Sequence, residues 1–103
     1  MVSLIYSTVG NVDAAKRIAR SLVEEHLVAC VNILPSVTSV YRWKGKMEED
    51  TECVLIAKTV EKKVEQAIQK IRSLHPYEIP DIVAVPVTSG LKEYLAYIED
   101  ETR

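Results

Sequence analysis

The sequence predicts an α+β fold, an antiparallel sheet with helices packed on one face, in the order β-α-β-β-α-β with one further helix at the C-terminus. Three observations support it. Segments rich in Val and Ile alternate with a period of two, apolar residues recur at helical spacing between them, and Gly, Pro or Asn separate the two kinds of segment. With 103 residues, we expect a single domain over residues 1–103.

The first half of the chain predicts a strand, a helix and a long strand. Residues 2–8 alternate and precede Gly10 and Asn11, which is typical of a strand followed by a turn. Residues 12–26 place their apolar side chains on one helical face, which ends at His26. Residues 28–41 form an unusually long strand-like run, and residues 43–46 form the predicted turn.

The second half predicts a strand, a helix, a strand and a short helix. Residues 51–59 are strand-like, and Thr59 is the predicted N-cap of the helix whose inner stripe runs from Val64 to His75. Residues 82–88 form a nearly continuous apolar strand. Ser89 or Gly90 then opens the last helix, which is expected to face inward through Leu91, Tyr94, Leu95 and Ile98.

This order resembles the ferredoxin-like split βαβ arrangement, in which the first and third strands are central. Pro35 and Pro86 fall in the second and fourth strands, which agrees because proline is tolerated mainly at sheet edges and bulges. If the hairpin closes around Gly45, Cys30 lies opposite the region of residue 60 and away from Cys53. We therefore expect two free thiols rather than a disulfide.

Both faces of the second and third strands are largely apolar, whereas two helices cover only one face of a sheet. The open face is therefore expected to associate with another copy, and the long hairpin to pair with that neighbour. Asn32 and Lys58 fall on this face. A buried lysine is costly unless paired, so Glu78 or a bound anion is a candidate partner of Lys58; the competing interpretation is a lysine whose stem extends to the edge of an interface.

Composition excludes several function classes. The net charge is −2 without a basic cluster, which disfavours nucleic acid, and no apolar run approaches the roughly 18 residues that span a bilayer. The N-terminus does not read as a signal peptide, so we expect a cytoplasmic protein. No phosphate loop or catalytic motif is present, so we expect neither an organic cofactor nor an enzyme; a Cys30–His75 nucleophile is the weakest alternative.

The segment from His75 to Pro80 carries the densest chemistry. His75, Tyr77 and Glu78 lie around Pro76 and before Pro80, which stiffen the connection between a helix and a strand. A rigid loop with such side chains is typical of a functional site, and the competing interpretation is a plain turn with His75 at the end of the helix.

Metal binding is a second possibility. Sulfur and imidazole suit copper or zinc, and the chain offers Cys30, Cys53, His26, His75 and several carboxylates without close ligand spacing. Any site is therefore expected to be open, shared between subunits or weak. For His26, a structural role at the end of the first helix is the preferred interpretation.

Four motifs together resemble the CutA family of divalent-cation tolerance proteins: ACVNI at residues 29–33, SVYRWKGK at 39–46, KT at 58–59 and LHPYEIP at 74–80. The resemblance covers essentially the whole chain. It implies a ferredoxin-like fold, a tight homotrimer like that of PII signalling proteins, and a link to tolerance of copper and other divalent cations.

The resemblance also implies a site. Some family members are described as binding copper through a cysteine at the end of the first strand and two adjacent histidines. Here Ser7 and Leu74 stand at two of these positions and only His75 remains, so weak metal binding through His75 and Cys30 is expected. The residues matching family motif positions are expected to line an intersubunit cleft: Cys30, Asn32, Trp43, Lys58, His75, Tyr77 and Glu78.

The leading functional hypothesis is a homotrimeric divalent-cation (copper) tolerance protein whose only expected partner is itself. The alternative is a PII-like sensor or signalling module that binds a small anionic ligand in its intersubunit clefts. The least favoured is the Cys/His enzyme.

Overall fold

The computed structural model describes residues 1–103 and has the predicted element order. The elements are β1 (Val2–Val9), α1 (Val12–Glu24), β2 (Cys30–Trp43), β3 (Lys46–Val60), a 3₁₀ turn η1 (Glu61–Lys63), α2 (Val64–Leu74), β4 (Ile82–Pro86) and α3 (Lys92–Glu101).

The four strands form one antiparallel sheet in the order β2-β3-β1-β4. The α+β class and the central position of β1 and β3 are thus confirmed. Both prolines lie in edge strands, Pro35 in β2 and Pro86 in β4. Edge strands tolerate them because one side of an edge strand needs no backbone donor.

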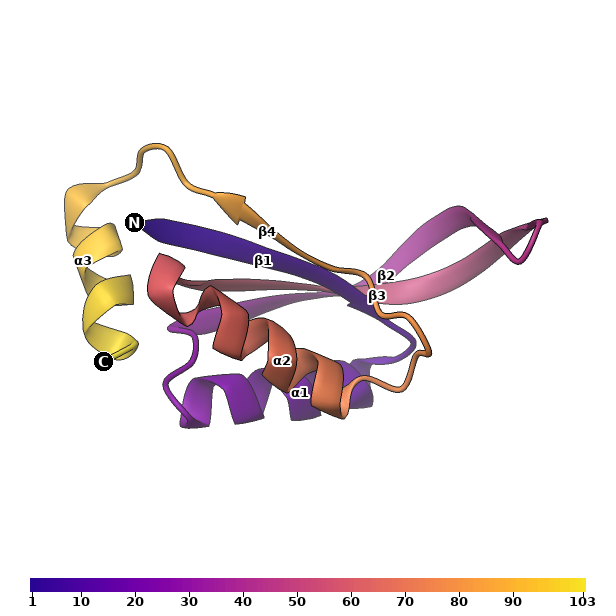
Figure 1. The fold of residues 1–103 in the computed structure, drawn as a ribbon, viewed down its shortest axis with the longest axis horizontal. Coiled ribbons are helices and arrows are strands. Elements are labelled where there is room, and N and C mark those ends of the chain that lie inside the picture. The colour runs from indigo at the N-terminus through magenta and orange to yellow at the C-terminus, as the bar shows by residue number, and fades with distance from the viewer.

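Helices α1 and α2 pack side by side on one face of the sheet (Figure 1). The main core lies between these layers and includes Ile5, Val9, Ile18, Leu22 and Ile71, all nearly inaccessible to solvent. The apolar helix faces and the apolar strand faces predicted from the sequence both contribute to this core. Side chains three or four residues apart share a face of a helix, and side chains two residues apart share a face of a strand.

Helix α1 begins and ends through local polar contacts. The Asn11 side chain accepts a 2.8 Å hydrogen bond from the Ala14 N–H at the N-terminus. The helix ends at Glu24, and His26 lies beyond it with a left-handed φ of 58°. Its Nδ1–H donates to the Glu101 carbonyl (3.1 Å), so His26 has a structural role between α1 and α3 rather than inside α1.

The predicted N-cap at Thr59 is wrong. Strand β3 runs on to Val60, and the turn η1 precedes α2. The Thr59 hydroxyl is fully buried and donates to the Leu27 carbonyl at 2.7 Å. Its bond therefore ties β3 to the loop before β2. The end of α2 agrees with the sequence, because His75 is the extended residue that follows Leu74.

Strands β2 and β3 extend beyond the helices as a long hairpin (Figure 1). Its turn is Lys44–Gly45, and both residues have positive φ (49° and 82°), as in a type I′ turn. Strand β3 begins at Lys46 and not at residue 51. The acidic residues 48–50 fit within a strand because this overhang has no core on either side.

A bulge between Leu34 and Val37 adds one residue to β2. Together with the two-residue turn it shifts the pairing, so Cys30 lies opposite Lys58 rather than near Val60. Cys53 is buried on the helix-covered face and Cys30 lies on the opposite face, and both thiols are free, as predicted.

The opposite face of the sheet, which we call the open face, remains apolar and largely uncovered. Its side chains include Leu4, Tyr6, Leu34, Ile56, Val83 and Val85. Tyr6, Leu34, Val83 and Val85 are all more than a third exposed in the single chain. Helix α3 covers only one end of this face, because its 10 residues span only about 15 Å.

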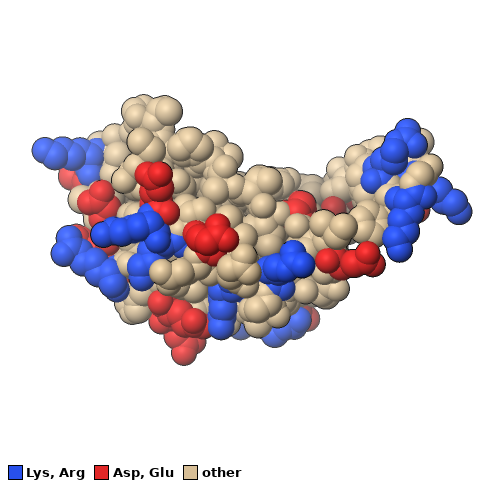
Figure 2. Space-filling view, in the orientation of Figure 1, with Lys and Arg blue, Asp and Glu red and all other residues tan.

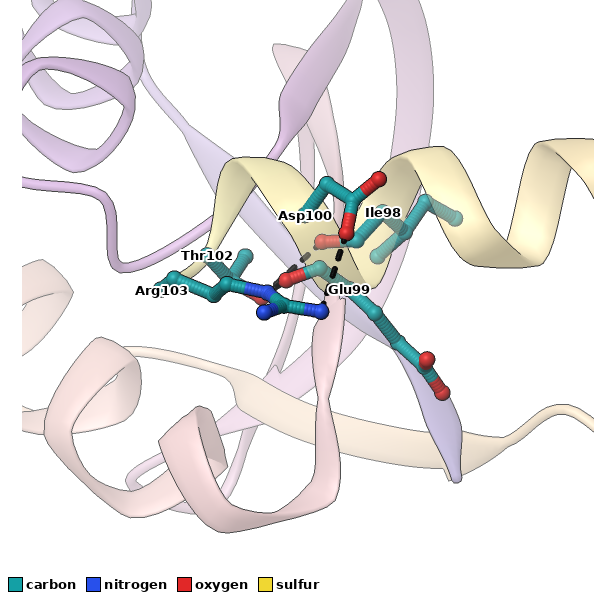
Figure 3. A network of polar contacts seen from close by, with 5 residues as sticks. All are labelled: Ile98, Glu99, Asp100, Thr102 and Arg103. Carbon is teal, nitrogen blue, oxygen red and sulfur yellow. Dashed lines mark hydrogen bonds and ion pairs between the residues drawn. The ribbon is translucent and has the colours of Figure 1, made fainter.

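Helix α3 begins at Lys92, and Leu91, predicted to face inward, is exposed. Ile98 packs with Val2, Ala29 and Val60 in a second small core. At the C-terminal end, the buried Thr102 hydroxyl donates to the Ile98 carbonyl (2.9 Å), while Arg103 pairs with Asp100 (Figure 3). None of the three helices is both long enough and apolar enough to span a membrane.

Candidate functional site

A cleft of about 520 Å³ lies where the hairpin leaves the sheet, next to the loop after α2. It is lined by Tyr6, Thr8, Ser39, Tyr41, Trp43, Asp50, Glu52, Tyr77, Glu78, Ile79 and Asp81. We call it the acid-lined cleft, since its lining has four carboxylates and no lysine or arginine. Its volume is typical of a small-molecule site.

The bulge in β2 creates one wall of this cleft. Before the bulge, the even-numbered residues of β2, such as Asn32, lie on the open face. After the bulge, the odd-numbered residues Ser39, Tyr41 and Trp43 pair with β3 so that they share the open face with Asp50 and Glu52. One additional residue therefore turns two aromatic side chains towards the cleft, because strand side chains alternate between faces.

Two carboxylates that line the cleft are hydrogen-bonded only by neutral donors. Glu52 is 8% exposed and accepts a 2.6 Å hydrogen bond from the Tyr77 hydroxyl. Asp81 accepts from the Thr8 hydroxyl through both oxygens, at 2.8 and 2.7 Å. These bonds fix the carboxylates in position and leave their negative charge without a cation.

The carboxylates raise the pKa of two tyrosine hydroxyls in the cleft. Desolvation and the hydrogen bond to Glu52 raise the pKa of Tyr77 well above its usual range. The hydrogen bond that Tyr41 donates to Asp50 raises the pKa of Tyr41 to about 12. Both phenols therefore remain protonated donors at any physiological pH.

The rim of the cleft is formed by Trp43 at the hairpin and Glu78 in the proline-flanked loop. Lys44, in the hairpin turn, places its Nζ 5.5 Å from the Trp43 ring centroid and 4.0 Å from Glu78 Oε1. Basic side chains gather at the hairpin tip, outside the lining of the cleft (Figure 2). Asp50, Glu52 and Asp81 form no ion pair.

His75 lies beside the cleft with both ring nitrogens occupied. Its Nε2–H donates to the Thr8 carbonyl at 2.7 Å, and its Nδ1 accepts the Tyr77 N–H at 3.2 Å. Because a carbonyl only accepts, Nε2 carries the proton and the ring is the neutral tautomer. Its lone pair is already used, and the ring, 8% exposed, packs edge-on against Tyr77 at 4.6 Å. His75 therefore positions the Tyr77 loop.

Cys30 and Lys58 lie at the other end of the sheet, on the open face beside α3. Cys30 Sγ is 3.6 Å from the Tyr94 hydroxyl, to which Lys58 Nζ donates at 3.0 Å. This hydrogen bond raises the pKa of Lys58, against the opposing effect of burial. The expected pairing of Lys58 with Glu78 is wrong within one chain, since Glu78 faces Lys44 instead.

The predicted metal ligands do not meet within one chain. Cys30 lies next to Lys58, which pairs with Leu4, whereas His75 bonds to Thr8, four residues and about 13 Å further along β1. Ser7 is fully buried beneath the helices, and Leu74 is partly exposed. No three His, Cys, Asp or Glu side chains converge closely enough to hold a metal ion. This donor set does not fit a copper centre inside the chain, and a site shared between subunits stays a prediction.

Three of the predicted cleft residues thus come together in one chain, namely Trp43, Tyr77 and Glu78. Lys58 bonds to Tyr94 on α3, and Asn32 lies opposite Ile56 on the open face; neither lines the acid-lined cleft. Sequence reasoning missed the carboxylates Asp50, Glu52 and Asp81. The only available signal was the acidic run at residues 48–52 directly after the hairpin turn.

Comparison with known proteins identifies the family of the chain. The model of the CutA1 divalent ion tolerance protein family matches residues 3–101. The Protein CutA homolog of Xenopus laevis is 46% identical over 99 residues, which are 96% of this chain but 66% of that protein, so the chain spans slightly less than two thirds of its length.

Two solved structures extend the likeness to the fold. The divalent cation tolerance protein of Thermus thermophilus is 42% identical, with a TM-score of 0.96 over the full length of both chains. The PII-like protein CutA from Nostoc sp. PCC 7120 is 38% identical, with a TM-score of 0.90 over 98% of this chain and 97% of that one. The motif resemblance is therefore confirmed, and the chain belongs to the CutA1 divalent ion tolerance protein family.

Proposed function

We propose that this chain acts in divalent-cation tolerance as a homotrimer, and that the acid-lined cleft is where cations are held. The observation that carries the proposal is the charge of the cleft. Four carboxylates line it, no basic side chain does, and three of the carboxylates form no ion pair. Oxygen-rich sites of this kind attract hard divalent cations.

Binding is expected to be weak. Since no three potential ligands converge on one point, a cation is held through its own water shell rather than by direct coordination. An affinity of micromolar or poorer corresponds to about −8 kcal/mol or less favourable. Copper held by softer ligands, through Cys30 and donors of a neighbouring subunit, remains the more specific part of the proposal.

The trimer is supported by the open face and the hairpin. Apolar side chains such as Tyr6, Leu34, Val83 and Val85 are exposed in the single chain. Exposed apolar surfaces of this extent mark association sites, and obligate interfaces are apolar like a domain core. The three-fold number is taken from the family. Sedimentation of a monomer at micromolar concentration would contradict it.

A PII-like small-ligand module is the second candidate. Aromatic side chains and a volume of about 520 Å³ favour an organic ligand. The four carboxylates disfavour the anionic ligand that the sequence suggested, so a ligand of this cleft is expected to be cationic.

An enzyme is the weakest candidate, because Cys30 bonds with Tyr94 and His75 with Thr8. Two free thiols suit a reducing compartment such as the cytoplasm.

Calorimetric titration of the assembled protein with Mn²⁺, Mg²⁺ and Cu²⁺ tests the proposal. Glu52→Gln and Asp81→Asn are expected to weaken Mn²⁺ binding, whereas Glu65→Gln, on α2 and outside the cleft, is the charge-matched control. Equal Mn²⁺ affinity in all variants, or no heat from any of the three ions, would contradict a cation site in this cleft.

A further inference from the structure

The open face carries opposite charges at its two ends. At the hairpin end lies the acid-lined cleft, whose lining includes Glu52 and Glu78. At the other end, beside α3, lies Lys58, six residues further along β3 and about 20 Å from Glu52. The hairpin and α3 lie at opposite ends of the molecule (Figure 1). Between the two charged ends this face is apolar, with side chains such as Leu34 and Ile56.

Lys58 has no carboxylate partner in its own chain. Its Nζ donates to the Tyr94 hydroxyl at 3.0 Å and lies 5.3 Å from the centroid of the Tyr94 ring, and it forms no ion pair. An ammonium has three donors, and the Tyr94 hydroxyl occupies one. When another subunit covers this face, the ammonium loses water, which is costly unless a carboxylate replaces it. Association therefore favours an acidic partner for Lys58 from the other subunit.

Glu78 is the carboxylate of the cleft that is most available to such a partner. The other three, Asp50, Glu52 and Asp81, are each held by a hydroxyl of their own chain. No hydroxyl bonds Glu78, and the nearest cation is Lys44 at 4.0 Å. Both side chains of that pair are about 70% exposed, so the pair contributes little and is easily exchanged.

A ring of three subunits uses two different patches of each subunit. One patch faces the neighbour on one side and the second patch faces the other neighbour, because the interfaces around a three-fold axis are heterologous. The two ends of the open face are two such patches, and they are complementary in charge. Complementary charges across an interface fix the register in which two surfaces dock.

We propose that Lys58 of one subunit pairs with Glu78 at the rim of the acid-lined cleft of its neighbour. The partner that this surface fits is a second copy of the chain, docked head to tail, and the cleft is complete only when that copy contributes its lysine. The inference rests on the homotrimer of the proposed function and names the contact that sets its register. Asp50, Glu52 and Asp81 keep their negative charge, so the cleft can still hold a cation.

Charge reversal tests this pairing in sedimentation at decreasing protein concentration, with urea added at one fixed concentration if dilution alone does not dissociate the assembly. Lys58→Glu and Glu78→Lys are each expected to raise the dissociation midpoint about tenfold or more, because each places like charges together. The double variant restores opposite charges and is expected to return the midpoint to within about threefold of that of the unmodified protein. Lys16→Glu and Glu65→Lys, singly and together, are the matched controls on α1 and α2, outside the open face.

Recovery in the double variant supports a direct pair, because a change at Glu78 cannot restore the bond between Lys58 and Tyr94 within one chain. If a reversed variant does not fold, Lys58→Gln, Glu78→Gln and their combination give the same comparison, and the combination is expected to cost no more than either single change. A trimer whose dissociation the single changes leave unaltered, or whose double variant loses the sum of the two single losses, would overturn the inference and leave the homotrimer standing. A monomeric unmodified protein would overturn both.

Discussion

Ser7 gives the sharpest test of the packing described above. Its side chain is fully buried beneath the helices, and its hydroxyl is the one buried side-chain polar atom without a hydrogen-bond partner. In the sheet it pairs with Leu55 and Ile82. We predict that Ser7→Ala stabilises the protein, because it removes a polar group that gains nothing in exchange for its lost hydration.

The magnitude follows from two opposing effects. An unsatisfied buried hydroxyl costs about 1–3 kcal/mol. The substitution also loses the packing contacts of one oxygen atom, each worth about 0.1–0.2 kcal/mol. The expected net gain is about 1 kcal/mol per chain, which raises the melting temperature of a domain of this size by about 4–8 °C.

Thr59→Val is the matched control. Its hydroxyl is equally buried on the same face of the sheet, but it donates to the Leu27 carbonyl at 2.7 Å. Valine keeps the shape and leaves that carbonyl without its donor, so we expect a loss of about 1–3 kcal/mol. Both variants are compared with the unmodified protein by denaturant unfolding at one protein concentration, since assembly contributes to stability.

Opposite signs for the two variants support the assignment. If Ser7→Ala is destabilising, or costs as much as Thr59→Val, the Ser7 hydroxyl has a partner and the reasoning from its isolation fails.

A copper titration adds a second measurement at the same position. Ser7→Cys restores the cysteine implied by the family resemblance, but it is expected not to raise the affinity for copper because the position is inaccessible to solvent.

Three further predictions concern the cleft and the hairpin. Alkaline titration followed by tyrosinate absorbance should show Tyr41 and Tyr77 ionising after the other tyrosines, and Tyr41→Phe should remove one of these late steps. The pKa of each phenol in the folded protein is raised above the usual value of about 10, to about 12 for Tyr41. The stability that their hydrogen bonds contribute is therefore present below about pH 10 and is lost as the pH rises through the folded pKa. His75→Gln should lower stability by about 1–3 kcal/mol, by breaking the bond to the Thr8 carbonyl, and leave copper binding by calorimetry unchanged; reduced copper binding would restore His75 as a ligand. Trp43→Ala should weaken assembly in sedimentation at low protein concentration if the hairpin docks on a neighbour, and an unchanged assembly removes this residue from the interface.

The sequence by itself determined the element order, the edge and central strands, the free cysteines and the family. These are consequences of local chemistry: alternating or helical apolar spacing, prolines confined to edge strands, and contiguous motifs. Most of these features can be read within a few residues along the chain, whereas the free cysteines follow from the places of Cys30 and Cys53 in the predicted hairpin.

The tertiary structure alone decided which candidate residues share a site. One additional residue at the bulge after Leu34 reverses which side chains of β2 reach the open face, and so brings Tyr41 and Trp43 to Asp50 and Glu52 while Asn32 and Lys58 lie outside the cleft. The tertiary structure also decided that both ring nitrogens of His75 are hydrogen-bonded, one to Thr8 and one to Tyr77. Strand phase after a bulge and hydrogen bonds between residues 67 positions apart depend on the packed backbone, and no pattern of residue types along the chain specifies them.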